Sequence, residues 1–80
     1  MSKQNQSVEI VLHVDDNLGE KQRNELVSSL SANDGVYNAR FTPNREHLML
    51  VEYNRIKYKA VDILQKLTNC RVRAELIGPI

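Results

Sequence analysis

Residues 8–19 form the segment VEIVLHVDDNLG, and this stretch decides how the rest of the chain is organised. Apolar side chains alternate along its first half, as in a β-strand with one face in a core. The acidic turn that follows predicts a helix start, since Asp16 or Asn17 can accept hydrogen bonds from the first free N–H groups of a helix. The side chains expected to face the core are Val8, Ile10, Leu12 and Val14.

The length and composition of the chain limit the number of its domains, the partners it could bind and the compartment it suits. Its 80 residues suffice for one domain, predicted at 8–80 after a disordered tail at 1–7. With 11 Lys and Arg against 10 Asp and Glu, the net charge of +1 does not favour nucleic acid or an anionic membrane. Cys70 is the only cysteine, which excludes an internal disulfide and suits a reducing compartment. No apolar run could cross a membrane, so we expect a cytoplasmic protein.

A helix and a second strand follow the opening stretch. Apolar residues at helical spacing predict a helix over 19–32, and Gly35 can adopt the left-handed conformation just after its end. The residues 36–42 then return to a strand pattern. A shift in the spacing of the apolar positions before Ala39 indicates a β-bulge in this strand.

The second half of the chain repeats the same order of elements. A turn at 43–46 joins the second strand to a third over 47–53, which together predict a hairpin. Asn54 is suited to cap a second helix over about 56–68. A last alternating strand is predicted over 71–77, giving the order βαββαβ.

This order predicts an α+β fold, the ferredoxin-like βαββαβ sandwich. Right-handed crossovers place the first and third strands at the centre of a four-stranded antiparallel sheet, with both helices on one face. The other face is then open. We expect it to carry an apolar centre with polar side chains around it, formed by Val11, Leu48, Leu50, Glu9, His13 and Glu52.

Two short elements resemble the heavy-metal-associated domains of copper chaperones and metal-transporting ATPases. Gly35-Val36 stands where that family has a Gly-Val pair, and the segment 51–54, VEYN, is similar to its V-x-Y-D element. The resemblance implies the same fold over nearly the whole chain. The family binds soft metals through a C-x-x-C loop, but Leu18 and Lys21 stand at the two cysteine positions. Neither can bind copper or zinc at neutral pH, so the family's metal function does not carry over.

A metal site made from other residues would need ligands that the sequence does not bring together. His13, Asp15, Asp16 and Cys70 are the candidates, but no spacing such as C-x-x-C or H-x-x-x-H gathers two of them, and His47 is expected elsewhere. Two adjacent carboxylates alone make a poor site for a hard cation. Near the end of the second helix, Cys70 is expected to be a small buried apolar residue. We therefore predict no cofactor.

Enzymatic and RNA-binding functions also lack their usual residues. The first strand-to-helix loop offers Asp15 and Asp16 where a phosphate would need a cation, and no nucleophile motif is present. The third strand would present Leu48, Leu50 and Glu52 on its open side, not the aromatic side chains that stack on RNA bases. We expect no catalysis, and no nucleic acid as a partner.

Three functions remain as hypotheses. The leading one is a non-catalytic interaction or regulatory module that binds a protein partner, or a second copy as a homodimer, through the open sheet face or an edge strand. The alternatives are a heavy-metal binding or transport domain with non-standard ligands, and a small-ligand sensor. The residues predicted for the interaction are Val11, His13, Leu48, Leu50 and Glu52.

Overall fold

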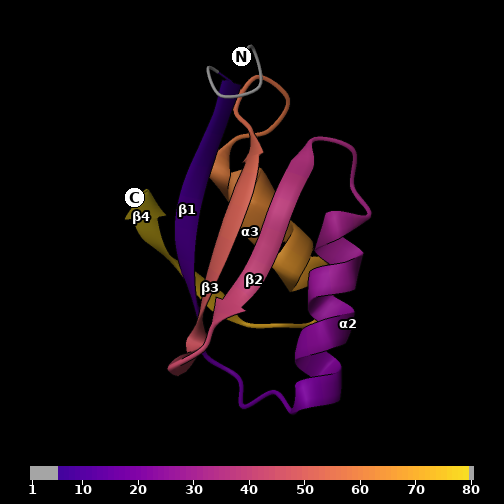
Figure 1. Cartoon of the computed structure of the whole chain (residues 1–80), viewed down its shortest axis with the longest axis vertical. Coiled ribbons are helices and arrows are strands. Elements are labelled where there is room, and N and C mark those ends of the chain that lie inside the picture. The colour runs from indigo at the N-terminus through magenta and orange to yellow at the C-terminus, as the bar shows by residue number, and fades with distance from the viewer. Residues whose placement is uncertain (1–5, 80) are drawn as a thin grey trace.

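The computed structural model describes residues 6–79, and for Pro79 it describes the backbone only. Its elements are β1 (Ser7–Val14), α2 (Glu20–Ser31), β2 (Val36–Thr42), β3 (Arg45–Asn54), α3 (Ala60–Asn69) and β4 (Ala74–Pro79). Figure 1 shows them in this order, and the predicted βαββαβ fold is confirmed. Residues 1–5 of the predicted tail at 1–7 lie outside the described residues. The last residue of that range, Ser7, belongs to β1.

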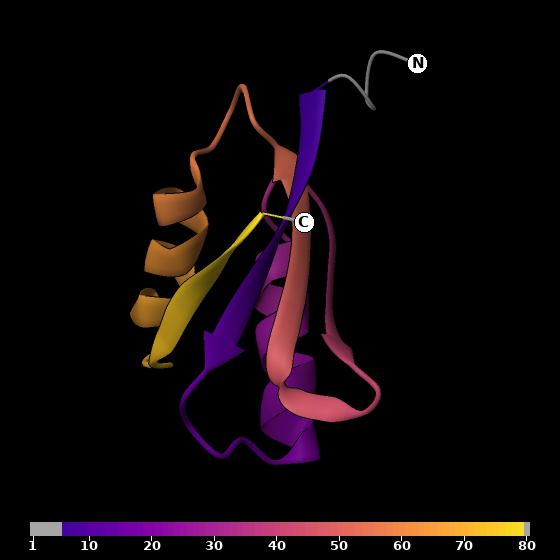
Figure 2. The same ribbon diagram turned by 90° about the vertical axis from the view of Figure 1, so that its left-hand side faces the viewer.

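The four strands form one antiparallel sheet in the order β2-β3-β1-β4, so β1 and β3 are central as predicted. In Figure 1, α3 lies behind this sheet and α2 flanks β2, and no helix lies in front of the strands. Figure 2, turned by 90°, shows α3 on one side of the sheet. The predicted bulge is confirmed, because the register between β2 and β3 shifts between Val36 and Asn38.

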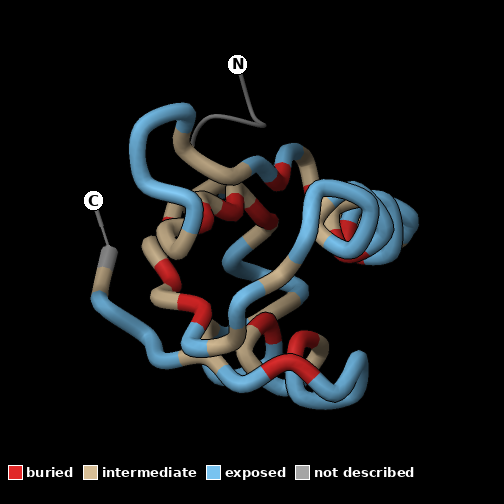
Figure 3. The backbone as a smooth tube through the Cα atoms, turned by 90° about the horizontal axis from the view of Figure 1, so that it is seen from below, coloured by how far each residue is buried: buried red, intermediate tan, exposed pale blue. Residues whose placement is uncertain are grey.

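A single core fills the space between the sheet and the helices. Leu26 and Leu30 of α2, and Ile63 and Leu67 of α3, are buried against the inward side chains of the strands. Figure 3 shows these buried segments facing the interior, with exposed segments on the outer sides of the helices. The four core positions predicted in β1 all pack here, three of them buried and Val8 partly buried. The apolar side chains that recur every second residue in β1 and about every 3.6 residues in the helices are therefore buried in the same core.

Both predicted helix caps are wrong. Gly19 occupies the N-cap position of α2, and its N–H donates to Gln22 Oε1 at 2.9 Å. At the second helix, Asn54 accepts from the Ile56 N–H at 2.8 Å and closes a separate turn, so that α3 begins only at Ala60. An Asn side chain stabilises a turn as readily as a helix start, and Asn54 forms the turn. The Asp16 carboxylate instead accepts from the Arg73 backbone N–H.

The boundaries of two strands also differ from the prediction. β3 begins at Arg45, because the hairpin turn is shorter than the four residues 43–46. β4 begins at Ala74 instead of residue 71, because Arg71 has a positive φ of 64° and the chain has not yet become extended. β4 then continues to Pro79 with a register shift against β1 between Val11 and Leu12.

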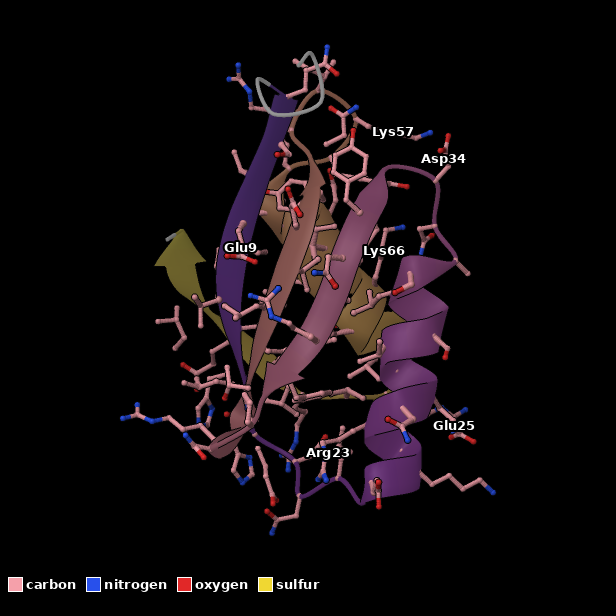
Figure 4. The ribbon with its side chains drawn as sticks, viewed as in Figure 1. Glu9, Arg23, Glu25, Asp34, Lys57 and Lys66 are labelled. Atoms are coloured by element: carbon pink, nitrogen blue, oxygen red, sulfur yellow. The ribbon has the colours of Figure 1, made fainter. Side chains whose placement is uncertain are left out.

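A cluster of polar contacts ties the turn after α2 to the connection before α3. The Lys57 ammonium donates to Asp34 Oδ2 at 2.7 Å, and the Tyr58 hydroxyl donates to the Asp34 carbonyl at 2.8 Å. The Lys66 ammonium lies 4.7 Å from the centre of the Tyr58 ring. Figure 4 labels Asp34 and Lys57 near the upper end of the molecule, with Lys66 below them. Within the described residues, no helix is long and apolar enough to span a membrane.

Candidate functional site

The loop between β1 and α2 is held by contacts within the chain. The Asp16 carboxylate accepts hydrogen bonds from the Arg73 backbone N–H at 2.9 Å and from its guanidinium at 3.2 Å. The backbone hydrogen bond, more than the guanidinium charge, lowers the pKa of Asp16 below its ordinary value of 3.8. The Asp15 N–H donates to the Arg73 carbonyl at 2.8 Å. These bonds fasten the loop to the segment that precedes β4.

The side chains of this loop do not suit a metal ion. Leu18 packs against the core, and its carbonyl accepts a hydrogen bond from the Arg23 guanidinium at 2.7 Å. Lys21 is exposed and carries a cationic ammonium group. Asp16 is engaged by Arg73, and Asp15 by His13 at 2.9 Å. A soft metal would find no thiolate here, and a hard cation would have to displace both carboxylates from their partners.

The predicted open sheet face is present and holds the five predicted interaction residues. Register pairs place Val11 opposite Leu50, and His13 opposite Leu48. All of these side chains are half-buried, because neighbouring side chains of the sheet shield them while no helix covers them. We use the name open face for the side chains of Glu9, Val11, His13, Arg40, Leu48, Leu50, Glu52 and Glu75, which the register places together.

Charge on the open face is unevenly compensated. Glu9 and Glu52 lie directly opposite one another on β1 and β3, a position at which like charges destabilise a sheet. Arg40 of β2 donates to Glu9 Oε2 at 3.2 Å and neutralises one of the two. Figure 4 shows Glu9 on β1 at this side of the sheet. Among the residues that the structure describes, neither Glu52 nor Glu75 forms an ion pair, so the face carries an acidic excess.

The structure brings together two histidines that the sequence analysis had placed apart. The rings of His13 and His47 lie with their centroids 5.7 Å apart and their planes inclined by 16°. Both line a pocket at the end of the sheet where β1 ends and β3 begins, together with Asn44, Arg45, Glu46 and Leu48. Alternation along β3 puts residue 47 on the side opposite to residue 48, so the β1–β3 register, which sets residue 13 opposite residue 48, does not by itself predict this pair.

Cys70, the remaining metal candidate, does not join these histidines. It lies just after α3 and is exposed, so the prediction of a buried thiol was wrong. Its sulfur is 3.7 Å from Ser29 Oγ of α2. Over residues 6–79, no cluster of three or more His, Cys, Asp or Glu side chains is arranged to hold a metal.

Comparison with known proteins identifies the fold. No protein-family model matches the sequence, and no curated protein matches it. Among solved structures, a copper-binding domain from HMA7, a P-type ATPase, superposes with a TM-score of 0.80 at 18% identity, covering 90% of this chain and 96% of that domain. The yeast copper transporter domain CCC2A gives 0.78 at 19% identity, with 91% and 99% covered. Oxidized MerP from Ralstonia metallidurans CH34 gives 0.76 at 11% identity, with 89% and 97% covered. The chain therefore has the fold of the heavy-metal-associated domains, without the metal-binding loop that the resemblance led us to look for.

Proposed function

We propose that this chain is a non-catalytic interaction module that binds a partner protein on the open face of its sheet. The observation that carries the proposal is the pair Glu9 and Glu52, set opposite one another beside the apolar side chains of Val11 and Leu50. A sheet stabilised only for itself would gain from an opposite charge at one of these positions. We therefore expect a partner to supply the positive charge that would pair with this acidic excess.

The chemistry of the open face favours one kind of partner. Its apolar centre would dock against an apolar surface, and the uncompensated Glu52 and Glu75 would face Lys or Arg side chains at the rim of the contact. A second copy fits less well. A two-fold contact of the open face with itself would bring its acidic excess against the same excess. We therefore assign the face to a different protein that is apolar and basic.

The fold supports a binding role and gives no reason to propose catalysis. The similar solved structures include copper-binding domains, but this chain has Leu18 and Lys21 where the family that it resembles has two cysteines. A cytoplasmic location remains part of the proposal, because an exposed, unpaired Cys70 suits a reducing compartment. A small-ligand sensor is the rival that a thermal-shift screen would reveal through stabilisation by one compound.

The test compares capture of the partner by wild type and by matched variants. Leu50→Asp places a carboxylate in the apolar centre of the open face, and Glu52→Lys reverses a charge at its rim. Val61→Asp is the control, because Val61 is 59% exposed on α3, away from the open face. We expect a protein captured from lysate and then purified to bind wild type and Val61→Asp equally. Its affinity for Leu50→Asp should fall by at least about tenfold, and Glu52→Lys should weaken binding most at low salt.

Sedimentation velocity separates a partner from a second copy. We expect wild type to sediment as a monomer. A wild-type dimer that Leu50→Asp dissociates would assign the open face to self-association and overturn the proposed partner. Equal binding by Leu50→Asp and Val61→Asp would place the contact elsewhere on the molecule.

A further inference from the structure

The edge strand β4 adds a further apolar side chain beside the open face. Leu12 of β1 pairs with Leu76 of β4, and Val11 pairs with Gly78. Ile77 has no partner between these pairs and is the extra residue of a β-bulge. Because Leu12 is a core position, alternation directs the residue that follows Leu76 to the other side of the sheet. The side chain of Ile77 therefore lies at the β4 edge of the open face, and it is 60% exposed.

The space beside Ile77 is unfilled. Gly78 lies opposite Val11, and a Cβ built on Gly78 would meet nothing within 4 Å. A glycine inside a strand often marks a place where another backbone approaches closely. This corner of the open face therefore offers an exposed apolar side chain next to free space.

Ile77 stands at the end of a line of apolar side chains that crosses three strands. Leu50 of β3 lies opposite Val11 of β1, and Ile77 is the bulge residue beside Val11 on β4. We name these three side chains the apolar row. Neighbouring strands are about 4.8 Å apart, so the row spans about 10 Å. Two turns of an α-helix cover the same length, since the helix pitch is about 5.4 Å.

Carboxylates flank the apolar row on both sides. Glu52 follows Leu50 by two residues on β3, whereas Glu75 precedes Ile77 by two residues on β4. Both strands run antiparallel to β1, so the two carboxylates lie on opposite sides of the row. At about 3.3 Å per residue, each lies about 7 Å from it along the strand. The row is therefore an apolar strip between two acidic margins.

An amphipathic helix presents the complementary pattern. Its apolar stripe runs along its length, and basic side chains on either side of the stripe reach both margins at once. An extended chain points its facing side chains along a single line, so it cannot place an apolar residue between two cations across its axis. Laid along the strands instead, an extended chain would cover one residue of the apolar row at a time.

We propose that the open face binds a basic amphipathic α-helix of a partner protein, which lies along the apolar row with Lys or Arg on both sides of its apolar stripe. This inference rests on the proposed function and adds the shape of the partner to it. Leu50 and Ile77 contact the two ends of the stripe, whose apolar residues follow the spacing i, i+4 and i+7. The basic residues pair with Glu52 at one margin and with Glu75 at the other.

The experiment uses three synthetic peptides as probes of the full chain. The first is a stapled helix with Leu at i, i+4 and i+7 and Lys on both sides of this stripe. The second has the same composition, rearranged so that Leu and Lys alternate as in a strand. The third is the stapled helix with Glu in place of every Lys. Fluorescence anisotropy measures the affinities, and amide ¹H–¹⁵N spectra locate the contact.

We expect the basic helix to bind and to shift the amide signals of Val11, Leu50 and Ile77. The rearranged and the acidic peptides should bind at least about tenfold more weakly, since one lacks the stripe with two basic sides and the other meets like charge. Binding of the basic helix should weaken as salt is added, because the charge pairs at the margins are exposed to solvent.

Matched variants of the chain test which side chains make the contact. Ile77→Ala shortens an exposed side chain and should lower the affinity for the basic helix about tenfold. Glu75→Gln should lower it about two- to fivefold at low salt and leave it unchanged at high salt. Glu25→Gln, an equal change of charge on the outer side of α2 (Figure 4), is the control and should have no effect.

The outcomes separate this inference from the proposed function. Equal or tighter binding of the rearranged peptide would overturn the helix, as would binding of the basic helix that Ile77→Ala and Leu50→Asp both leave unchanged. Absence of binding up to about 1 mM basic helix, while a purified partner still requires Leu50, would overturn the helix and leave the proposed function standing. If no such partner were found either, both would fall.

Discussion

Replacing Gly35 with alanine tests how the chain turns from α2 into β2. Gly35 has a φ of +97°, a conformation that L-residues rarely adopt and that costs them about 1–2 kcal/mol. An added Cβ would also lie 2.9 Å from Lys57 Cδ and 3.0 Å from Tyr58 Cε2. The Lys57 side chain can move, whereas the Tyr58 ring is held by its hydrogen bond to the Asp34 carbonyl. We expect Gly35→Ala to destabilise the fold by about 2–3 kcal/mol.

The two other glycines provide matched controls. Gly78 also has a positive φ, +145°, but nothing lies within 4 Å of its added Cβ, so Gly78→Ala reports the backbone effect alone. Gly19 has an ordinary φ of −74° and an added Cβ would make only an ordinary contact, so Gly19→Ala should change stability by less than about 1 kcal/mol.

Urea unfolding followed by circular dichroism measures all three variants, with the midpoint compared at a constant m-value. The expected order of destabilisation is Gly35→Ala, then Gly78→Ala, then Gly19→Ala. A stability for Gly35→Ala within about 0.5 kcal/mol of Gly19→Ala would refute the reasoning, because neither the backbone conformation nor the contact with Tyr58 would then matter.

Three further predictions concern the core, one tertiary hydrogen bond and pH. Leu67 is fully buried in α3, so Leu67→Ala should destabilise the protein by about 2–5 kcal/mol in urea unfolding, and a smaller loss would show that the core closes around the cavity. Tyr58→Phe removes the hydroxyl that donates to the Asp34 carbonyl and should cost about 0.5–1.5 kcal/mol by the same measurement; no change would mean that water replaces the bond. Because Arg73 lowers the folded-state pKa of Asp16, this carboxylate stabilises the fold above its unfolded pKa, and that stability is lost as the pH falls through the lower folded pKa. The stability difference between wild type and Asp16→Asn should therefore be largest near neutral pH and shrink below about pH 4, and a difference that does not depend on pH would contradict this linkage.

Much of the fold could be predicted because its causes are local. The alternation of Val8, Ile10, Leu12 and Val14 specifies a strand and its buried face within the strand itself. The order of six elements then leaves few topologies, and the right-handed crossover selects the sheet order that is observed. Gly35 was also identified correctly, because a positive φ favours glycine wherever it occurs.

Three residues of the loops and turns were not predicted correctly, each for its own physical reason. Asp16 was expected to cap α2, but it binds Arg73, 57 residues later, once β4 lies beside β1. Asn54 has an equally good use in a turn, so its sequence neighbours do not decide between turn and helix cap. Cys70 was expected to be buried because free cysteine usually is, but the turn after α3 leaves it exposed.

The same distinction applies to the open face. Because side chains alternate along a strand, the sequence was enough to predict which side chains of β1 and β3 face away from the helices. It therefore placed Val11, Leu48 and Leu50 on one face before their contacts were known. Which residues lie opposite one another could not be predicted in this way, since register depends on the hairpin and on packing across the whole sheet. That register sets Glu9 against Glu52, and the proposed function depends on this pair.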